Sequence, residues 1–434
     1  MRTRRVRSFL SRRRNRTKDG ILVARPGART GQPPRRRTTI GAMADAALVA
    51  ELTRNAVHVL PEGELERKLD AGRPLRVKLG IDVTSPDIHV GRAIPLQRMR
   101  AFQDAGHVGV LIVGDYTTRI GDPSGRSSER PVLSDEEIDR NAQTYVDQAM
   151  IVLDPDRTEV RYNGEWLAKL DFAEIVRLTR VATVAELLTR DDFRKRYESE
   201  LPISVSELLY PLAQGYDSVA VEADVELGGT DQLYNLLMGR KVMEAYGLEP
   251  QVALTTPLLL SWDGEKMSSS VGNNVPLTAA PEEQYGRTMR IPDALLGEWY
   301  RLVLESDDDP LAGDPMGAKL RLARWVVARS HGEGAAEAAE AHFTRVVREG
   351  KAPEDVPEVT IAADGGTVYL PALLAEHLGI ASTSEGRRLI AGGGVKLDGE
   401  AVTELEVPAS RLDGALLQAG KRRFARVSVR PETA

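Results

Sequence analysis

The sequence predicts an α/β fold in which helices cover both faces of a parallel sheet. From about residue 75 onward, short runs rich in β-branched residues alternate with helical stretches, and strands that alternate with helices form parallel sheets. The expected strands are residues 75–81, 108–113, 219–225 and 252–260. Residues 93–105 are expected to form a helix that ends at Gly106. Because ligands of such sheets bind outside the carboxyl ends of the strands, we expect the chemistry in the loops after Ile81 and Val113.

Length and composition limit the possible functions. The chain has 434 residues, enough for two or three domains. It contains no cysteine, which excludes disulfides and thiolate metal sites and fits a cytoplasmic protein. The six histidines are scattered, so a zinc site is not expected. No run of about 18 apolar residues occurs, so we expect no membrane span.

The first 42 residues are strongly basic. They contain 13 arginines and one lysine against a single acid, Asp19. A segment so charged and so poor in apolar residues cannot bury enough surface to fold alone. It is a disordered basic arm for nucleic acid, an arginine-rich transit peptide, or an extension upstream of the true start at Met43. We favour the third interpretation, because Met43 directly precedes an Ala-, Glu- and Leu-rich segment expected to be the first helix.

Two further regions follow the α/β region, which we expect to span residues 43–275. Between residues 276 and 356 the strand pattern fades, and residues 351–357 form a Pro- and acid-rich linker. Residues 364–430 predict a small α+β domain with a strand at 395–397 and further short strands after it. The helices expected in these two regions are residues 281–305, 316–330, 335–348, 370–378 and 384–391.

Two polar segments have the composition of a triphosphate site. The first runs from a strand through His89 and Gly91 into a helix. A helix N-terminus favours negative charge, and a glycine there lets a nucleotide approach the backbone. His89 would then donate a hydrogen bond to a phosphate oxygen. The second, residues 266–270 with the sequence Lys-Met-Ser-Ser-Ser, offers one cation and three hydroxyls on a loop that could close over a triphosphate.

Three other segments offer groups for a small polar ligand. Asp122 lies in a turn of sequence Gly-Asp-Pro-Ser-Gly-Arg, where its carboxylate could hold an ammonium. On a helix, Tyr210, Gln214 and Asp217 would share one face, and such a polar face can grip a small ligand. Residues 227–232, Leu-Gly-Gly-Thr-Asp-Gln, permit close backbone approach, and their aspartate could accept hydrogen bonds from ribose hydroxyls.

Each segment alone is weak evidence, but together their order and spacing resemble the class I tyrosyl-tRNA synthetases. The resemblance runs from about residue 45 to residue 430. It implies a Rossmann-like catalytic domain with a doubly wound parallel sheet, an α-helical anticodon-binding domain and a small α+β RNA-binding domain of the S-four type. The implied activity is that of a tyrosine–tRNA ligase, which activates L-tyrosine with ATP and magnesium and transfers it to tRNA(Tyr). A homodimer without a tightly bound cofactor is also implied.

The resemblance further implies a role for each matching residue. The residues implied to bind tyrosine are Lys78, Asp122, Tyr210, Gln214, Asp217 and Gln232. The residues implied to bind ATP are Gly80, Asp82, Thr84, His89, Gly91, Gly228, Asp231, Lys266, Met267, Ser268 and Ser270. Those implied to act in catalysis are His89, Arg92, Lys266 and Ser269, and no metal ligand is implied. Asp217 would accept from the substrate phenol. The substrate carboxylate would attack the α-phosphorus without a general base, so positioning and electrostatics supply the acceleration.

Two positions depart from the family pattern. Arg92 stands where the family usually has a second histidine, and Ser269 stands where many bacterial members have a second lysine. Positive charge is therefore gained at one position and lost at another near the triphosphate, and we expect the two changes to compensate. Two alternatives remain at this stage: a paralogue that acts on a modified aromatic amino acid, and an RNA-binding regulatory protein that has lost catalysis.

Overall fold

The computed structural model describes residues 45–124, 133–349, 351–353, 356–363, 366–420 and 423–430. The predictions for residues 1–42 lie outside this range. The strands of the first region are β1 (His58–Leu60), β2 (Arg76–Ile81), β3 (Val108–Val113), β4 (Thr158–Tyr162), β5 (Val225–Gly229) and β6 (Val252–Thr256). Its helices are α1 (Ala46–Leu52), α2 (Glu64–Asp70), α3 (Val90–Asp104), α4 (Thr117–Ile120), α5 (Asp135–Ala149), α6 (Gly164–Leu167), α7 (Phe172–Thr179), α8 (Val184–Leu187), α9 (Asp191–Glu198), α10 (Val205–Ala220) and α11 (Leu233–Ala245), with 3-10 turns η1 (Pro155–Arg157) and η2 (Thr230–Gln232).

The six strands form one sheet with the order β1-β6-β5-β2-β3-β4. Neighbours from β6 through β4 pair in parallel, and β1 pairs antiparallel with β6. The predicted parallel α/β sheet is therefore confirmed. The chain order reverses between β5 and β2, and ligands of doubly wound sheets bind at such a reversal.

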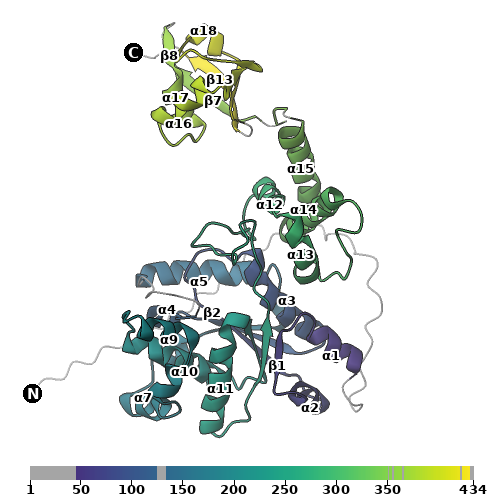
Figure 1. Ribbon diagram of the computed structural model, residues 1–434, viewed down its shortest axis with the longest axis vertical. Coiled ribbons are helices and arrows are strands. Elements are labelled where there is room, and N and C mark those ends of the chain that lie inside the picture. The colour runs from purple at the N-terminus through teal and green to yellow at the C-terminus, as the bar shows by residue number, and fades with distance from the viewer. Residues whose placement is uncertain are drawn as a thin grey trace, which may run out of the picture. The chain divides into compact units, whose positions relative to one another are not determined.

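Both faces of the sheet are covered. Along β3, Leu111 and Val113 belong to the core shared with α3 and α5, whereas Val110 and Ile112 pack with Val221 on the opposite face. Figure 1 shows α3 and α5 on one side of β2 and α10 and α11 on the other. Burial on both faces explains why β3 is an unbroken apolar run, the pattern typical of parallel strands.

Several expected boundaries differ from the structure. The strand expected at residues 219–225 is wrong, because a capping box at Ser204 and Glu207 starts α10, which continues to Ala220. The strand begins at Val225 instead. Strand β4 was not predicted, because its residues are half-buried at the sheet edge and include three charged or polar side chains. Residues 281–305 contain two helices rather than one, with Pro292 between them.

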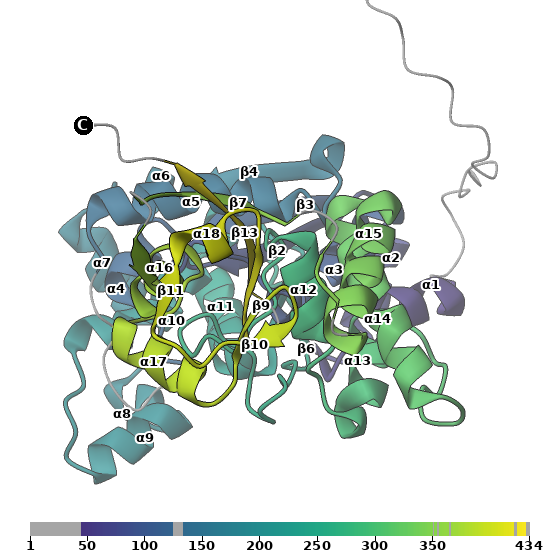
Figure 2. The same ribbon diagram turned by 90° about the horizontal axis from the view of Figure 1, so that it is seen from above.

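The second region is helical. Its elements are α12 (Pro281–Thr288), η3 (Asp293–Leu295), α13 (Leu296–Leu302), α14 (Pro315–His331), α15 (Glu333–Phe343) and a π-helical turn at Thr344–Arg348. Helices α14 and α15 lie side by side (Figure 1 and Figure 2). The side chains of Tyr285, Ala323 and Ala336 belong to one buried cluster that joins α12, α14 and α15.

The third region is a small α+β domain with its own core. Its elements are β7 (Glu358–Ala362), β8 (Thr367–Tyr369), α16 (Leu370–His377), α17 (Thr383–Ala391), β9 (Val395–Leu397), β10 (Glu400–Ala401), β11 (Glu406–Pro408), α18 (Ala409–Leu412), β12 (Leu416–Ala419) and β13 (Arg423–Arg430). Five strands form a sheet in the order β10-β9-β12-β13-β7, and β8 pairs with β11. The expected start at residue 364 is too late, because β7 pairs with β13. None of the described helices is both long enough and apolar enough to cross a membrane.

Helices α10 and α11 approach closely at Gly215. A Cβ atom there would lie 2.8 Å from Val242 Cγ2 and 3.1 Å from Gly239 Cα. We expect Gly215→Ala to lower the free energy of unfolding, measured by urea denaturation, by about 1–3 kcal/mol, because the helices must move apart. Gly286→Ala in α12 is the control: its Cβ meets nothing within 4 Å, so the better helix former should not destabilise the chain. Equal stability of the two variants would contradict the packing described here.

Candidate active site

A cavity of about 700 Å³ lies at the carboxyl ends of β2, β3, β5 and β6. It occupies the reversal of strand order and includes residues of the loops after Ile81 and Val113, where the sequence predicted the chemistry. Every predicted site residue except Lys78 lines it, namely Gly80, Asp82, Thr84, His89, Gly91, Arg92, Asp122, Tyr210, Gln214, Asp217, Gly228, Asp231, Gln232, Lys266, Met267, Ser268, Ser269 and Ser270. Residues that are far apart in the sequence thus line one cavity.

His89 caps the N-terminus of α3 at one end of the cavity. Its Nδ1 accepts a hydrogen bond of 3.3 Å from the backbone N–H of Arg92, so the imidazole proton resides on Nε2. Burial, followed by the nearby charges of Arg92 and Lys266, lowers the pKa of His89 to about 3. The ring is therefore neutral at physiological pH and offers one N–H. Gly91 leaves space for this ring, because a Cβ at that position would lie only 3.2 Å from His89 Nδ1.

The loop of residues 266–270 crosses the same end of the cavity. Met267 anchors it, with a side chain 2% exposed in the core and a backbone N–H that donates to Leu259 O at 2.9 Å. Lys266 Nζ lies 2.6 Å from Asp231 Oδ2. Ser269 Oγ accepts from Asn274 Nδ2 at 3.2 Å. The loop's cation is thus paired with the carboxylate that the sequence assigned to the ribose.

Arg92 contacts Tyr145 on α5. Its guanidinium donates to the Tyr145 hydroxyl and lies 5.8 Å from the centre of that ring. The same hydroxyl lies 3.1 Å from Ser85 Oγ. One further side chain of α5 holds this loop, since Gln148 accepts from the backbone N–H of Ile88 and donates to Pro86 O. Helix α5 therefore fixes the loop before α3.

Asp217 lies at the opposite end of the cavity. Its side chain is almost completely buried, and it accepts hydrogen bonds from Trp166 Nε1 at 2.8 Å and Asn163 Nδ2 at 3.3 Å. Burial raises the pKa of Asp217 to about 7, against the lowering effects of Lys78, Trp166 and Asn163. A buried carboxylate with this pKa is a strong acceptor for a hydroxyl that enters the cavity.

Tyr210 and Gln214 lie between the two ends, one helical turn apart on α10. The Tyr210 hydroxyl donates to Asp82 Oδ2 at 3.0 Å, and Thr117 Oγ1 donates to Asp82 Oδ1 at 2.8 Å. Asp82 therefore orients Tyr210, although the sequence assigned it to ATP. Gln214 Nε2 donates to Glu226 Oε1 at 3.0 Å, so its amide oxygen is the end that can accept from a ligand.

Lys78 does not contact the cavity, which corrects its predicted role in binding. Its side chain is completely buried, and Nζ lies 2.9 Å from Glu226 Oε1. The ammonium also donates to Ser218 Oγ and to the backbone oxygen of Gln214, both at 2.8 Å. A buried lysine needs a counter-charge and full hydrogen bonding, and Glu226 and α10 provide both. Lys78 thus lies outside the cavity and fixes the position of α10 through these hydrogen bonds.

Asp122 is engaged at both carboxylate oxygens. Ser124 donates to Oδ1 through its backbone N–H at 2.9 Å and its hydroxyl at 2.6 Å. Gln232 Nε2 donates to Oδ2 at 2.8 Å. The remainder of the predicted turn, Gly125 and Arg126, lies outside the described residues.

Four residues at or next to the cavity were not predicted from the sequence, namely Asn163, Trp166, Tyr145 and Arg287. Asn163 directly follows β4, so a prediction of that strand would have pointed to it. Arg287 of α12 lines the cavity and donates to Asn274 O at 2.7 Å, and no pattern in the sequence links it to the loop of residues 266–270. Within the described parts of the chain, no group of three or more His, Asp or Glu side chains is arranged to hold a metal ion.

Comparison with known proteins decides the family. Residues 70–348 match the family described as tRNA synthetases class I (W and Y). A tyrosine–tRNA ligase of Moorella thermoacetica is 48% identical over 391 residues, which cover 87% of this chain and 94% of that protein. The chain belongs to the tyrosyl-tRNA synthetases. A second relative of this synthetase, a tyrosine–tRNA ligase of Thermotoga maritima, is 45% identical over 388 residues, covering 87% of this chain and 96% of that protein.

Solved structures agree with the fold of this synthetase. The tyrosyl-tRNA synthetase of Archaeoglobus fulgidus, complexed with L-tyrosine, has a TM-score of 0.55 and 21% identity, covering 68% of this chain and 98% of that one. A truncated mitochondrial tyrosyl-tRNA synthetase of Aspergillus nidulans has a TM-score of 0.56 and 22% identity, covering 68% and 92% of the two chains.

The pKa of Asp217 generates a test for L-tyrosine, the substrate that the sequence predicts. As the pH falls below about 7, Asp217 gains a proton and loses the negative charge that, by the predicted role, would accept a hydrogen bond from the phenol. We expect kcat/KM for tyrosine to fall by up to about tenfold per pH unit below that point. His89, with a pKa of about 3, does not titrate in this range.

The control for this pH profile is Asp217→Asn, which cannot ionise. Its kcat/KM for tyrosine should be low and independent of pH between about 5.5 and 8. A flat wild-type profile over the same range would show that Asp217 is ionised throughout or does not meet the substrate.

Proposed function

We propose that this synthetase activates L-tyrosine with ATP and transfers the tyrosyl group to tRNA(Tyr) within the cavity described above. The observation that carries this proposal is the polarity of the cavity. One end has a buried carboxylate suited to a phenol, and the other has an imidazole N–H, a helix N-terminus and cations suited to a triphosphate. The activity of the family to which the chain belongs, tyrosine–tRNA ligation, fits this arrangement.

Tyrosine would enter with its phenol towards Asp217. Its ammonium would meet Asp122, the amide oxygen of Gln214 and the hydroxyl oxygen of Tyr210, which can accept while donating its proton to Asp82. Gln232 would then lie beside the substrate carboxylate. The groups that would meet the phenol and the ammonium are already hydrogen-bonded to neighbouring side chains. They are therefore held in the orientation needed for binding before the substrate enters.

ATP would bind across the N-terminus of α3, with magnesium held by its phosphates and by water. His89 Nε2 and the hydroxyl of Thr84 would donate to phosphate oxygens, and Gly91 would let the nucleotide approach the helix. The ribose would lie at Gly228 and Asp231. This requires Lys266 to leave Asp231, 2.6 Å away in the structure, and turn to the pyrophosphate.

The chemical step is an in-line displacement at phosphorus. The tyrosine carboxylate attacks the α-phosphorus, the bond to the β-phosphate oxygen breaks, and pyrophosphate leaves. Lys266 and the hydroxyls of residues 268–270 would stabilise the charge that develops on the leaving group. Arg287, which lines the same end of the cavity, brings a positive charge from α12 where Ser269 replaces a lysine. A hydroxyl of the terminal ribose of the tRNA would then attack the acyl carbon of tyrosyl-adenylate, the bond from that carbon to the phosphate oxygen would break, and AMP would leave with its phosphate ionised.

The deciding experiment is ATP–pyrophosphate exchange across a panel of aromatic amino acids, followed by charging of tRNA(Tyr). Exchange that depends on L-tyrosine supports the proposal. Exchange with a modified tyrosine alone would favour the paralogue with a changed substrate. A folded, ATP-binding sample that exchanges with no amino acid would favour the RNA-binding regulatory protein.

His89 tests the phosphate end of the site. We expect His89→Ala to reduce pyrophosphate exchange by about 10²-fold or more, because one positioned donor to developing charge is lost. Its equilibrium affinity for tyrosine should change little. His89→Asn is the matched variant, since asparagine can also cap α3 and offers an N–H, and it should retain more activity. Unchanged exchange in His89→Ala would show that the triphosphate does not lie at α3.

The small C-terminal domain and the helical region are proposed to bind tRNA. The C-terminal domain has its own core and two packed helices, α16 and α17, the framework that the sequence predicts for an S-four-type module. Arg387 and Arg388 of α17 supply cations suited to a phosphate backbone. The region 276–356 is proposed to face the anticodon.

We also propose that the enzyme is a homodimer that uses α7. Phe172 is 80% exposed, and Ile175 and Val176 are each 36% exposed. Their spacing places them on one face of the helix, and a contiguous apolar face of this kind typically marks an interface. A second copy of the same chain is the occupant that the family predicts.

Light scattering coupled to gel filtration tests this interface. The wild type should have twice the mass of the 47.5 kDa chain. Phe172→Glu should shift the mass to that of a monomer, because two charges would be buried at a symmetric contact. Leu311→Glu, at a position 47% exposed in the helical region, is the control and should remain dimeric. A dimer that survives Phe172→Glu would place the interface elsewhere.

A further inference from the structure

We propose that Arg190 is a positioning residue for the amino group of the substrate. It closes a ring of five side chains that fixes both carboxylate oxygens of Asp122. The inference rests on the proposed function in one respect, namely that Asp122 meets the tyrosine ammonium. Arg190 itself does not line the cavity, so it acts through its neighbours.

The ring can be followed from one hydrogen bond to the next. Arg190 Nη2 donates to Ser124 Oγ at 2.5 Å, and Ser124 Oγ donates to Asp122 Oδ1 at 2.6 Å. In the other direction, Arg190 Nη1 donates to Asn235 Oδ1 at 2.8 Å. Asn235 Nδ2 donates to Gln232 Oε1 at 2.9 Å, and Gln232 Nε2 donates to Asp122 Oδ2 at 2.8 Å. Every link has a donor facing an acceptor, so the ring has one consistent orientation.

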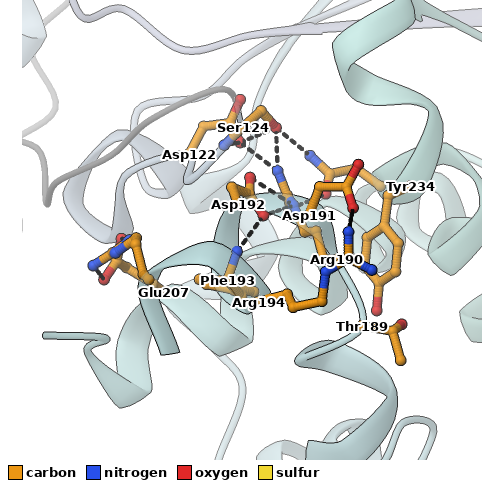
Figure 3. Close-up of polar contacts among 12 residues, drawn as sticks. Asp122, Ser124, Thr189, Arg190, Asp191, Asp192, Phe193, Arg194, Glu207 and Tyr234 are labelled. Atoms are coloured by element: carbon orange, nitrogen blue, oxygen red, sulfur yellow. Dashed lines mark hydrogen bonds and ion pairs between the residues drawn. The ribbon is translucent and has the colours of Figure 1, made fainter. Parts of the chain in front are cut away.

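The guanidinium is fixed from several sides. Arg190 is 7% exposed, and its third nitrogen, Nε, lies 2.8 Å from Asp192 Oδ1. The rings of Phe193 and Tyr234 lie 5.5 Å from its central carbon. Figure 3 shows Arg190 between Asp192 and Tyr234, pointing towards Ser124 and Asp122. A planar guanidinium held in this way can donate hydrogen bonds to two acceptors at once. The flexible ammonium of a lysine cannot do so in the same geometry.

The ring explains how one side chain orients two parts of the substrate site. Ser124 and Asn235 come from the loop after α4 and from α11, and Arg190 connects both to the start of α9. Arg190 Nη2 also lies 3.8 Å from Asp122 Oδ1, a distance at which the two opposite charges attract each other and draw the carboxylate towards the ring. Without Arg190, the hydrogen bonds on both sides of Asp122 would lose their common support, and a small misplacement of a binding group is costly.

The nearby pair Arg196–Glu207 provides a contrast. Arg196 is also buried and lies 2.7 Å from Glu207 Oε1. The hydrogen bonds described for its guanidinium reach Glu207 and the backbone oxygen of Pro202, which link α9 to α10 rather than to the cavity. Burial of an arginine in this region therefore does not by itself imply a connection to Asp122.

The test compares two ligands that differ only in the amino group, L-tyrosinol and 3-(4-hydroxyphenyl)propan-1-ol. Equilibrium dialysis is performed with the full chain and with Arg190→Gln. We expect Arg190→Gln to raise the Kd of tyrosinol by roughly 10- to 100-fold and to leave the Kd of the deaminated alcohol within about twofold. The KM for ATP at saturating tyrosine should also stay within about twofold. Equal weakening of both ligands would reveal a general distortion of the pocket, and no weakening would show that Arg190 is not coupled to it. Either result overturns the proposal.

Three further variants make the result decisive. Arg194→Gln removes an arginine on the same helix that is 52% exposed and pairs with Asp191, and it should bind both ligands as the wild type does. Asn235→Ala breaks the ring at another link, so it should reproduce the selective loss even if Arg190→Gln fails to fold. The double variant should then be no worse than the poorer single variant, because both act through one ring. Additive losses would contradict the ring.

Asp122→Ala separates this inference from the proposed function. If Asp122→Ala weakens tyrosinol selectively and Arg190→Gln does not, the positioning role is wrong and the binding site stands. If Asp122→Ala weakens neither ligand, the assignment of the ammonium to Asp122 fails, and the proposal about Arg190 fails with it.

Discussion

A buried ion pair joins the two central strands of the sheet. Lys78 on β2 and Glu226 on β5 are register partners, and their side chains are 0% and 1% exposed, with Nζ and Oε1 2.9 Å apart. Two charges removed from water are tolerated only when their remaining hydrogen bonds are also satisfied. Ser218 and Gln214 of α10 and Gln251, just before β6, supply those bonds. The ion pair therefore sets the position of α10 relative to the strands at the reversal of strand order.

The substrate site depends on that position. Helix α10 carries Tyr210, Gln214 and Asp217, so the same contacts that satisfy Lys78 and Glu226 also aim these side chains into the cavity. Asp217 is buried close to this pair, and Lys78 lowers its pKa while Glu226 raises it. The central pair thus contributes both to the position of these side chains and to the charge state of Asp217.

The two ends of the cavity are organised by opposite electrostatics. At the end proposed to bind tyrosine, Asp122 and Asp217 are buried, and each is hydrogen-bonded to neutral donors that fix its orientation. At the end formed by His89 and the loop of residues 266–270, the side chain of Lys266 is about half exposed, and it is paired with Asp231. The first arrangement suits selection of a small amino acid, because an unpaired buried group penalises a ligand that lacks the matching polar atom. The second suits exchange of partners when a highly charged nucleotide enters.

The sequence by itself determined the α/β class, the positions of β2 and β3, and most of the residues around the cavity. The fold class and the two strands depend on local signals, chiefly unbroken apolar runs and polar loops at strand ends. Most of the cavity residues were implied by the family resemblance, which depends on the order and spacing of several polar segments. Tertiary structure alone decided that Lys78 lies outside the cavity and that Asp82 is hydrogen-bonded to Tyr210. It also decided that Asn163 donates to Asp217, that Arg287 lines the cavity and that Arg190 is connected to Asp122 through hydrogen bonds. Each of these roles depends on contacts between residues far apart in the chain, such as Arg190 with Ser124 and Asn235. Such contacts leave no periodic trace in the sequence, because they are set by how the helices pack on the sheet rather than by any one segment.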